Sequence, residues 1–131
     1  MSYQYFALIQ PDSDADISKL KENLETFYAN KSKQPSISLE DNSILVDFED
    51  FDFEIYYAED EHVIDESIEM AEDFEVDFNE MAIDKEKVKL CAKRFEISGS
   101  DDDFDMNFMN DSLFILEQIE KFKGVTILNL N

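Results

Sequence analysis

The sequence of 131 residues contains few of the residues that common catalytic and binding sites require. Its one cysteine, Cys91, excludes an intramolecular disulfide and a zinc site built from several cysteines. Its two glycines, Gly99 and Gly124, do not form a Rossmann G-x-G-x-x-G turn or a P-loop. A serine nucleophile would have only His62 to serve as its base, because the chain has no other histidine. Nucleotide binding through these glycine-rich loops is therefore excluded.

Long apolar runs are also missing. No run approaches the roughly twenty apolar residues that a membrane helix needs, and the N-terminal residues lack the basic and apolar segments of a secretory signal. Together with the single cysteine, these features predict a cytoplasmic protein. Apolar residues still make up 44% of the chain, far more than in a disordered chain of low hydrophobicity. We therefore expect a single folded domain over residues 1–131.

Basic residues are scarce, and their distribution is uneven. The chain has 33 Asp and Glu against 11 Lys and Arg, which gives a formal net charge of −22. No Lys or Arg lies between Lys33 and Lys85, and a second stretch without them covers residues 95–120. A field of this sign repels nucleic-acid phosphates and anionic lipid surfaces and attracts cations or basic protein surfaces. We therefore expect a basic protein as partner, and neither a nucleic acid nor a membrane.

Hydrophobic periodicity predicts the secondary structure. Residues 3–9 and 125–130 are apolar on both alternating faces, which indicates strands covered on both sides. Period-two alternation predicts an antiparallel meander of strands over residues 37–39, 44–48 and 51–57. Helical spacing predicts helices over about 17–30, 59–74, 84–92 and 111–122. A short irregular piece is expected at 75–83, and a short strand at 95–97.

These elements, in the order βαβββααβαβ, predict an α+β fold with one mixed, mostly antiparallel sheet of five or six strands. The strands at 3–9 and 125–130 are expected to be central, with the helices packed mainly on one face. Asn110 and Asp111 are expected to cap the last helix, and Gly124 is placed as its C-terminal glycine. The apolar stripe expected on that helix is Leu113, Leu116, Ile119 and Phe122.

Three alternating carboxylates suggest a cation site. Asp101, Asp103 and Asp105 match the first three ligand positions of a calcium-binding loop. Met106 stands where that loop needs its turn glycine, and Ser112 stands where it needs its bidentate glutamate. We therefore interpret the segment as a solvated loop without a metal ion.

The residues that could carry catalysis have structural explanations. His62 falls among the charged residues of its predicted helix, which indicates a surface position. Cys91 lies three residues after Val88 on an apolar helical face, which is typical of a buried structural thiol. Glu66 and Glu69 share a solvated helix face, without the burial that glycoside hydrolysis needs to raise one pKa. We therefore predict a protein that is not an enzyme and that uses no cofactor.

What remains is an acidic surface interleaved with aromatic residues. In one interpretation the phenylalanines point inward and the carboxylates serve only solubility, as in a housekeeping or scaffold domain. In the other, the carboxylates form an electrostatic docking surface for a basic protein. The candidate partner-binding residues are Asp47, Glu49, Asp50, Asp52, Glu54, Asp101, Asp102, Asp103 and Asp105.

In size, charge and layout, the whole chain resembles the small acidic α+β immunity proteins with which bacteria neutralise toxins. It also resembles the phage-type acidic inhibitors that mimic DNA. The resemblance includes no diagnostic motif, so no site residues are transferred. It implies an inhibitor that docks on a basic protein such as a toxin nuclease, and this is the function that the sequence favours over a housekeeping domain or a DNA mimic.

Overall fold

The structure, a computed structural model, describes residues 2–73 and 84–130. Its strands are β1 (Gln4–Ile9), β2 (Ser36–Glu40), β3 (Ser43–Asp47), β4 (Asp52–Ala58), β5 (Lys93–Gly99) and β6 (Val125–Asn129). Its helices are α1 (Ile17–Tyr28), α2 (Glu61–Glu72), α3 (Lys85–Val88) and α4 (Met109–Glu120). The irregular piece expected at 75–83 lies outside the described residues.

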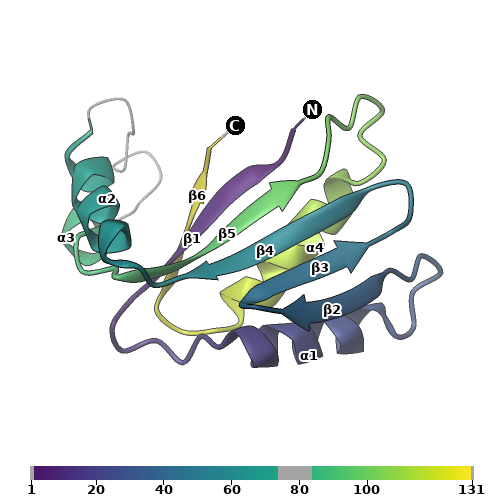
Figure 1. Ribbon diagram of the computed structural model, residues 1–131, viewed down its shortest axis with the longest axis horizontal. Coiled ribbons are helices and arrows are strands. Elements are labelled where there is room, and N and C mark those ends of the chain that lie inside the picture. Colours follow the sequence, from purple (N-terminus) through teal and green to yellow (C-terminus); the bar gives the residue numbers. More distant parts are fainter. Residues whose placement is uncertain (1, 74–83, 131) are drawn as a thin grey trace.

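The six strands form one open sheet in the order β2-β3-β4-β5-β1-β6 (Figure 1). Every neighbouring pair is antiparallel, which confirms the α+β fold with a single, mostly antiparallel sheet. β1 lies inside the sheet, between β5 and β6, as expected. β6 pairs with β1 but forms the edge, so its predicted central position is wrong. Apolarity on both faces of a strand reports the layers above and below the sheet, and it says nothing about neighbours within the sheet.

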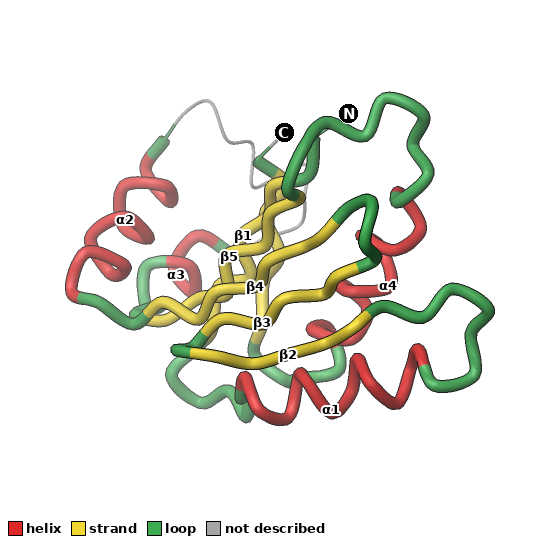
Figure 2. Tube along the Cα trace, turned by 45° about the vertical axis from the view of Figure 1, so that its right-hand side comes forward, coloured by secondary structure: helices red, strands yellow, loops and turns green. Residues whose placement is uncertain are grey.

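Both faces of β1 are covered by helices. Tyr5, Ala7 and Ile9 join the main core, to which α1 and α4 contribute. Leu8 faces the other way and packs in a second cluster with residues of β6, α2 and α3 and with the buried Cys91. Figure 2 shows α2 and α3 on the opposite side of the sheet from α1 and α4. The expected layering, with helices mainly on one face, thus describes α1 and α4 but not α2 and α3.

The part of the opposite face formed by β2, β3 and β4 is largely polar. One row of cross-strand neighbours on this face is Ser38, Leu45, Glu54 and Ser98. Inward-facing Phe53 and Ile55 of β4 are fully buried, whereas Glu54 between them is exposed. The period-two pattern of the sequence predicted this alternation on β4, with apolar residues on one face and acidic, solvent-exposed residues on the other.

Two helices begin at a capping aspartate, and a third begins before the cap that the sequence predicted. Asp16 Oδ1 accepts from Lys19 N at 2.8 Å and caps α1, and Asp84 Oδ1 accepts from Glu86 N at 3.0 Å and caps α3. α4 begins at Met109, so Asp111 lies inside its first turn and is buried rather than capping. No helix among residues 2–73 and 84–130 has the length and apolarity to cross a bilayer.

The buried face of α4 matches the predicted apolar stripe at all but one position. Leu113, predicted to lie in the core, is 46% exposed. The other three predicted residues, Leu116, Ile119 and Phe122, are buried as expected. Ser112, Ile115 and Gln118 are buried as well. The apolar stripe therefore predicted most of the buried face and was wrong at Leu113, because that face also includes the polar residues Ser112 and Gln118.

Candidate partner-binding surface

The two acidic segments that the sequence singled out lie side by side at one end of the sheet. Asp52 N donates to Ser100 Oγ at 3.1 Å, and Ser100 N donates to the Asp52 carbonyl oxygen at 2.9 Å. These bonds join the β3–β4 turn to the loop that follows β5, on the right in Figure 1. We call residues 47–54 and 100–108 together the acidic end.

Aromatic rings hold the acidic end together from beneath. The Phe51 and Phe108 rings stack at 4.7 Å between centroids with an interplanar angle of 14°. Phe48 lies 5.3 Å from Phe108, and Tyr3 meets Phe51 edge-on at 6.0 Å. Gly99 is needed here because a Cβ atom at this position would lie 2.8 Å from Phe51 Cζ. The turn and the loop are therefore fixed to each other as one unit.

Most of the candidate carboxylates are on the surface of this unit. Glu49, Asp50, Glu54, Asp101, Asp102 and Asp105 are exposed, and Asp47 and Asp52 are half-buried. Asp47 and Asp52 face each other directly across the β3–β4 ladder, where like charges destabilise the pair. Seven of these candidates form no ion pair with a Lys, Arg or His of residues 2–73 and 84–130: Asp47, Glu49, Asp50, Asp52, Glu54, Asp101 and Asp105.

Asp103 differs from its neighbours because its carboxylate is buried, with 6% of the residue exposed. It accepts hydrogen bonds from the Tyr3 hydroxyl at 2.6 Å, from Phe108 N at 2.8 Å and from Asn107 N at 3.1 Å. Burial by itself raises the pKa of Asp103, but these hydrogen bonds outweigh it and the pKa is lowered. Asp103 fixes the loop to Tyr3, the residue before β1, and it is not on the surface that a partner would contact.

A second buried carboxylate fastens α4 to α1. The Tyr28 hydroxyl donates to Asp111 Oδ1 at 2.8 Å, and Lys33 Nζ donates to Asp111 Oδ2 at 2.8 Å. Lys33 Nζ also lies 3.8 Å from the centroid of the Phe108 ring, a cation–π distance. Lys33 thus lies beside the acidic end, but its charge is paired with Asp111 there.

Sequence reasoning missed both of these tyrosine–carboxylate pairs. A signal was present, because Tyr3 and Tyr28 stand in apolar patterns and a buried tyrosine hydroxyl needs a hydrogen-bond partner. The sequence does not say which of the 33 acidic residues provides that partner.

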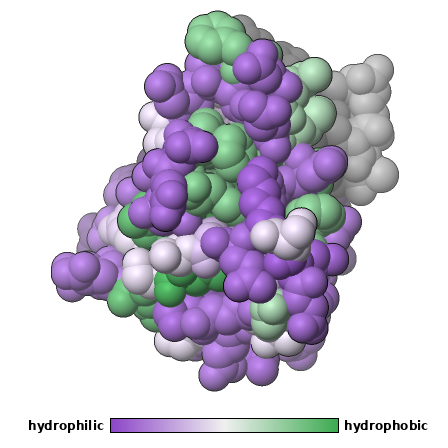
Figure 3. Space-filling model, turned by 90° about the vertical axis from the view of Figure 1, so that its right-hand side faces the viewer, coloured by the Kyte–Doolittle hydropathy of each residue, from purple (hydrophilic) through white to green (hydrophobic). Residues whose placement is uncertain are grey.

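The acidic end also exposes apolar side chains that the sequence did not single out. Phe104 is 84% exposed and Met106 is 53% exposed. The first turns of α4 add Met109 and Leu113, which are 36% and 46% exposed. Figure 3, which looks at this side of the molecule, shows hydrophobic residues gathered among hydrophilic ones.

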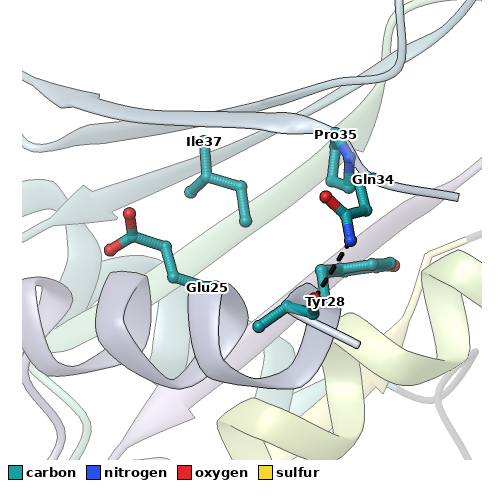
Figure 4. A pocket seen from close by; sticks show the side chains of 6 residues that line it. Glu25, Tyr28, Gln34, Pro35 and Ile37 are labelled. Carbon is teal, nitrogen blue, oxygen red and sulfur yellow. Dashed lines mark hydrogen bonds between the residues drawn. The ribbon is translucent and has the colours of Figure 1, made fainter. Parts of the chain in front are cut away.

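A surface hollow lined by described residues does not assemble a recognisable catalytic set. This hollow, of about 190 Å³, lies between the end of α1 and β2 (Figure 4). It is lined by Glu25, Tyr28, Ala29, Gln34, Pro35 and Ile37. Glu25 pairs with Lys21 at 3.0 Å, and Gln34 Nε2 donates to the Ala29 carbonyl oxygen at 3.0 Å. Its polar side chains are thus engaged with their own neighbours.

The two residues considered for catalysis have separate surroundings. His62 Nε2 lies 3.5 Å from Glu66 Oε1 on the exposed side of α2. Cys91 is fully buried, and burial raises the pKa of its thiol to about 11. The Cys91 thiol therefore stays protonated near neutral pH, where a nucleophilic cysteine needs a thiolate. Within residues 2–73 and 84–130, no three His, Cys, Asp or Glu side chains are placed to hold a metal ion.

Comparisons with known proteins add no relative to this description. No family model, no curated protein and no solved structure matches the chain. A function is therefore inferred from the geometry of the acidic end.

Proposed function

We propose that this protein is a non-enzymatic binding protein that docks through its acidic end on a basic protein partner and blocks it, as an immunity-type inhibitor does. The observation that carries the proposal is the convergence of two sequence-distant acidic segments on one surface. Seven carboxylates there have no ion pair with a cation of residues 2–73 and 84–130. Their mutual repulsion costs the free fold stability, and a basic partner would relieve it.

The charge would act mainly on the encounter of the two proteins. Complementary fields raise association rates to about 10⁸ M⁻¹s⁻¹ or more at low salt, against about 10⁵–10⁶ M⁻¹s⁻¹ without them. Salt at physiological concentration screens exposed charges beyond about 8 Å. Binding through the acidic end should therefore weaken as salt is added, chiefly because association becomes slower.

A comparison of two variants with the same net charge tests the proposal. The acidic-end variant carries Glu49→Gln, Asp50→Asn and Asp105→Asn, which are exposed positions in the turn and the loop. The control variant carries Asp65→Asn, Glu69→Gln and Glu72→Gln, which are exposed positions on α2. Each protein is immobilised and used to retain proteins from the source cells at low and moderate salt. Association rates are then measured with the purified retained protein.

We expect the wild type to retain a basic protein, and the acidic-end variant to associate with it about tenfold more slowly, with a flatter salt dependence. The control variant should show less than half of that slowing of association. A wild type that retains no basic protein contradicts the proposal. Equal slowing in both variants also contradicts it, because the effect would then reflect total charge. A housekeeping or scaffold domain predicts no such partner.

A further inference from the structure

Exposed apolar residues are concentrated beside the carboxylates of the acidic end. Of the large hydrophobic residues exposed by more than a third, four lie within residues 104–113: Phe104, Met106, Met109 and Leu113. Met109 and Leu113 are four residues apart on α4 and so lie on one helix face. Phe104 is 84% exposed, although Phe51 and Phe108 nearby are packed together. An exposed apolar cluster rimmed by polar residues is typical of an interaction site.

The segment that carries Phe104 is held in place by the fold. Asp103, which precedes it, is fixed by the Tyr3 hydroxyl, and the same carboxylate accepts from the backbone N–H groups of Asn107 and Phe108. The Met106 N–H donates to the Asp103 carbonyl oxygen at 3.1 Å, and Met106 has a φ of 55°, which is unfavourable for a side chain with a Cβ. A side chain presented from such a fixed turn loses little backbone entropy on binding.

The charge around this cluster decides what kind of surface covers it. Asp101 and Asp105 flank Phe104 and are exposed without an ion pair to residues 2–73 and 84–130. A second copy of the chain would bring two proteins of net charge −22 together, and anionic lipid or nucleic-acid phosphates would be repelled in the same way. The occupant that fits is a protein surface with an apolar pocket and basic residues around it.

We infer that Phe104 is the apolar anchor of the docking interaction: it enters an apolar pocket of the basic partner, whose rim of Lys and Arg meets Asp101 and Asp105. This inference rests on the proposed function and assigns separate roles to the charged and the aromatic side chains. The carboxylates accelerate the encounter, whereas the Phe104 side chain, which becomes buried in the complex, determines how long the complex lasts. Asp103 is a positioning residue, because it orients the turn without contacting the partner.

Photo-crosslinking from position 104 identifies what covers it. The full chain with Phe104→p-benzoylphenylalanine is irradiated in the source cells, beside a control with Leu90→p-benzoylphenylalanine. Leu90 is a suitable control because it is also a large apolar residue, 57% exposed, and it lies near the start of β5, whereas the acidic end follows the end of β5. We expect a basic protein to crosslink from position 104 and not from position 90.

The crosslinked protein is then purified and its binding kinetics are measured with Phe104→Ala, Phe104→Leu and Leu90→Ala. Phe104→Ala should raise the dissociation rate by roughly thirtyfold, the size expected for an anchor residue, while changing association by less than about threefold. Phe104→Leu should restore part of the loss, and Leu90→Ala should change neither rate by more than about twofold. Circular dichroism confirms that each variant is folded, which is expected because both side chains are exposed.

The outcomes separate the anchor from the proposed function. If a basic protein binds and depends on Glu49, Asp50 and Asp105, yet Phe104→Ala dissociates like the wild type or position 104 yields no crosslink, the anchor is wrong and the docking proposal stands. If the wild type binds no basic protein at all, both are wrong. Crosslinking to an acidic protein or to a second copy of the chain overturns the assigned partner chemistry.

Discussion

Carboxylates are paired with a cation at one end of β5, whereas several at the other end form no ion pair with a described cation. At its start, the buried Arg94 guanidinium lies 3.9 Å from the Phe6 ring centroid, and its Nε donates to Glu96 Oε2 at 2.8 Å. It also reaches Glu66 of α2 at 3.4 Å. At the end of the same strand, the acidic end collects carboxylates without ion pairs to the described cations and exposes Phe104. Acidic residues can therefore be neutralised by a cation in one region and left without ion pairs in another. The pattern of ion pairs distinguishes these two regions better than the number of acidic residues does.

Removing the ring that joins the turn to the loop should have the largest effect on this contrast. Phe51 is buried and stacked on Phe108, so Phe51→Ala leaves a cavity between the two acidic segments. We expect the free energy of unfolding to fall by about 3–5 kcal/mol, measured by urea denaturation. Phe27→Ala is the matched control, because Phe27 is only half-buried, and it should cost clearly less. Equal losses in the two variants would show that the aromatic cluster does not fasten the acidic end.

Asp103→Asn should have the next largest effect, because it weakens the hydrogen bonds that fix the loop. We expect a loss of about 1–3 kcal/mol in the free energy of unfolding at pH 7. The pKa of Asp103 is lowered in the folded protein, so its ionisation stabilises the fold above its unfolded pKa of about 4. That contribution is lost as pH falls through the folded pKa. The difference between wild type and variant should therefore be constant from about pH 7 to 5 and shrink below about pH 4.

Asp105→Asn is the control for this pH dependence. Asp105 is exposed on the same loop, and its side chain accepts no hydrogen bond from the described residues in the structure. Its replacement should leave stability at pH 7 unchanged or slightly raised. An Asp103→Asn variant as stable as Asp105→Asn at neutral pH would remove the structural role assigned to the buried carboxylate.

A smaller effect is expected from relieving the repulsion itself. The triple acidic-end variant should be more stable than the wild type by up to about 1 kcal/mol at low salt, because three uncompensated charges are removed. The gain should shrink as NaCl is raised from about 0.02 to 0.5 M, since screening then relieves the wild type as well. Thermal unfolding monitored by circular dichroism measures both. A gain that persists at high salt would point to a cause other than repulsion.

The smallest effect is expected at His62 on α2. Its contact with Glu66 is an exposed i,i+4 pair, so His62→Ala should change the free energy of unfolding by less than about 0.5 kcal/mol. Partner binding should be unchanged as well. A well-folded His62→Ala variant that loses a measured activity would overturn the non-enzymatic proposal.

The sequence predicted the class of fold because its periodicities are local. The alternation on β4 and the apolar stripe of α2 predict their elements directly, and Asp16 and Asp84 mark two helix starts. Pairing within the sheet is not local, and the double-sided apolarity of β6 is compatible with an edge strand once α2 and α3 cover one face. The sequence therefore predicted a central position for β6, whereas β6 pairs with β1 at the edge of the sheet.

The sequence singled out carboxylates that lie close together in the fold, but it did not predict the position of each one. The acidic segments 47–54 and 100–108 lie side by side, but among the three aspartates at 101, 103 and 105 the middle one is buried. Alternation along the chain does not reveal this, because the loop is not a strand and Asp103 turns toward Tyr3, which is distant in sequence. Phe104 was missed for the opposite reason, since a phenylalanine among carboxylates is ordinarily assumed to point inward.

The strand order also has a consequence for how the chain is made. β2, β3 and β4 are joined by two consecutive hairpins, so they can pair as soon as they are synthesised. β1 cannot complete its pairing so early, because Ile9 pairs with Lys93 and Tyr5 pairs with Asn129. Non-local pairing of this kind slows folding, and an apolar strand that emerges early stays open to aggregation until its partners arrive. The acidic end likewise needs β5 and the loop that follows it. A nascent chain would thus carry negative charge, which opposes aggregation through repulsion between chains, long before it could hold Phe104 in position.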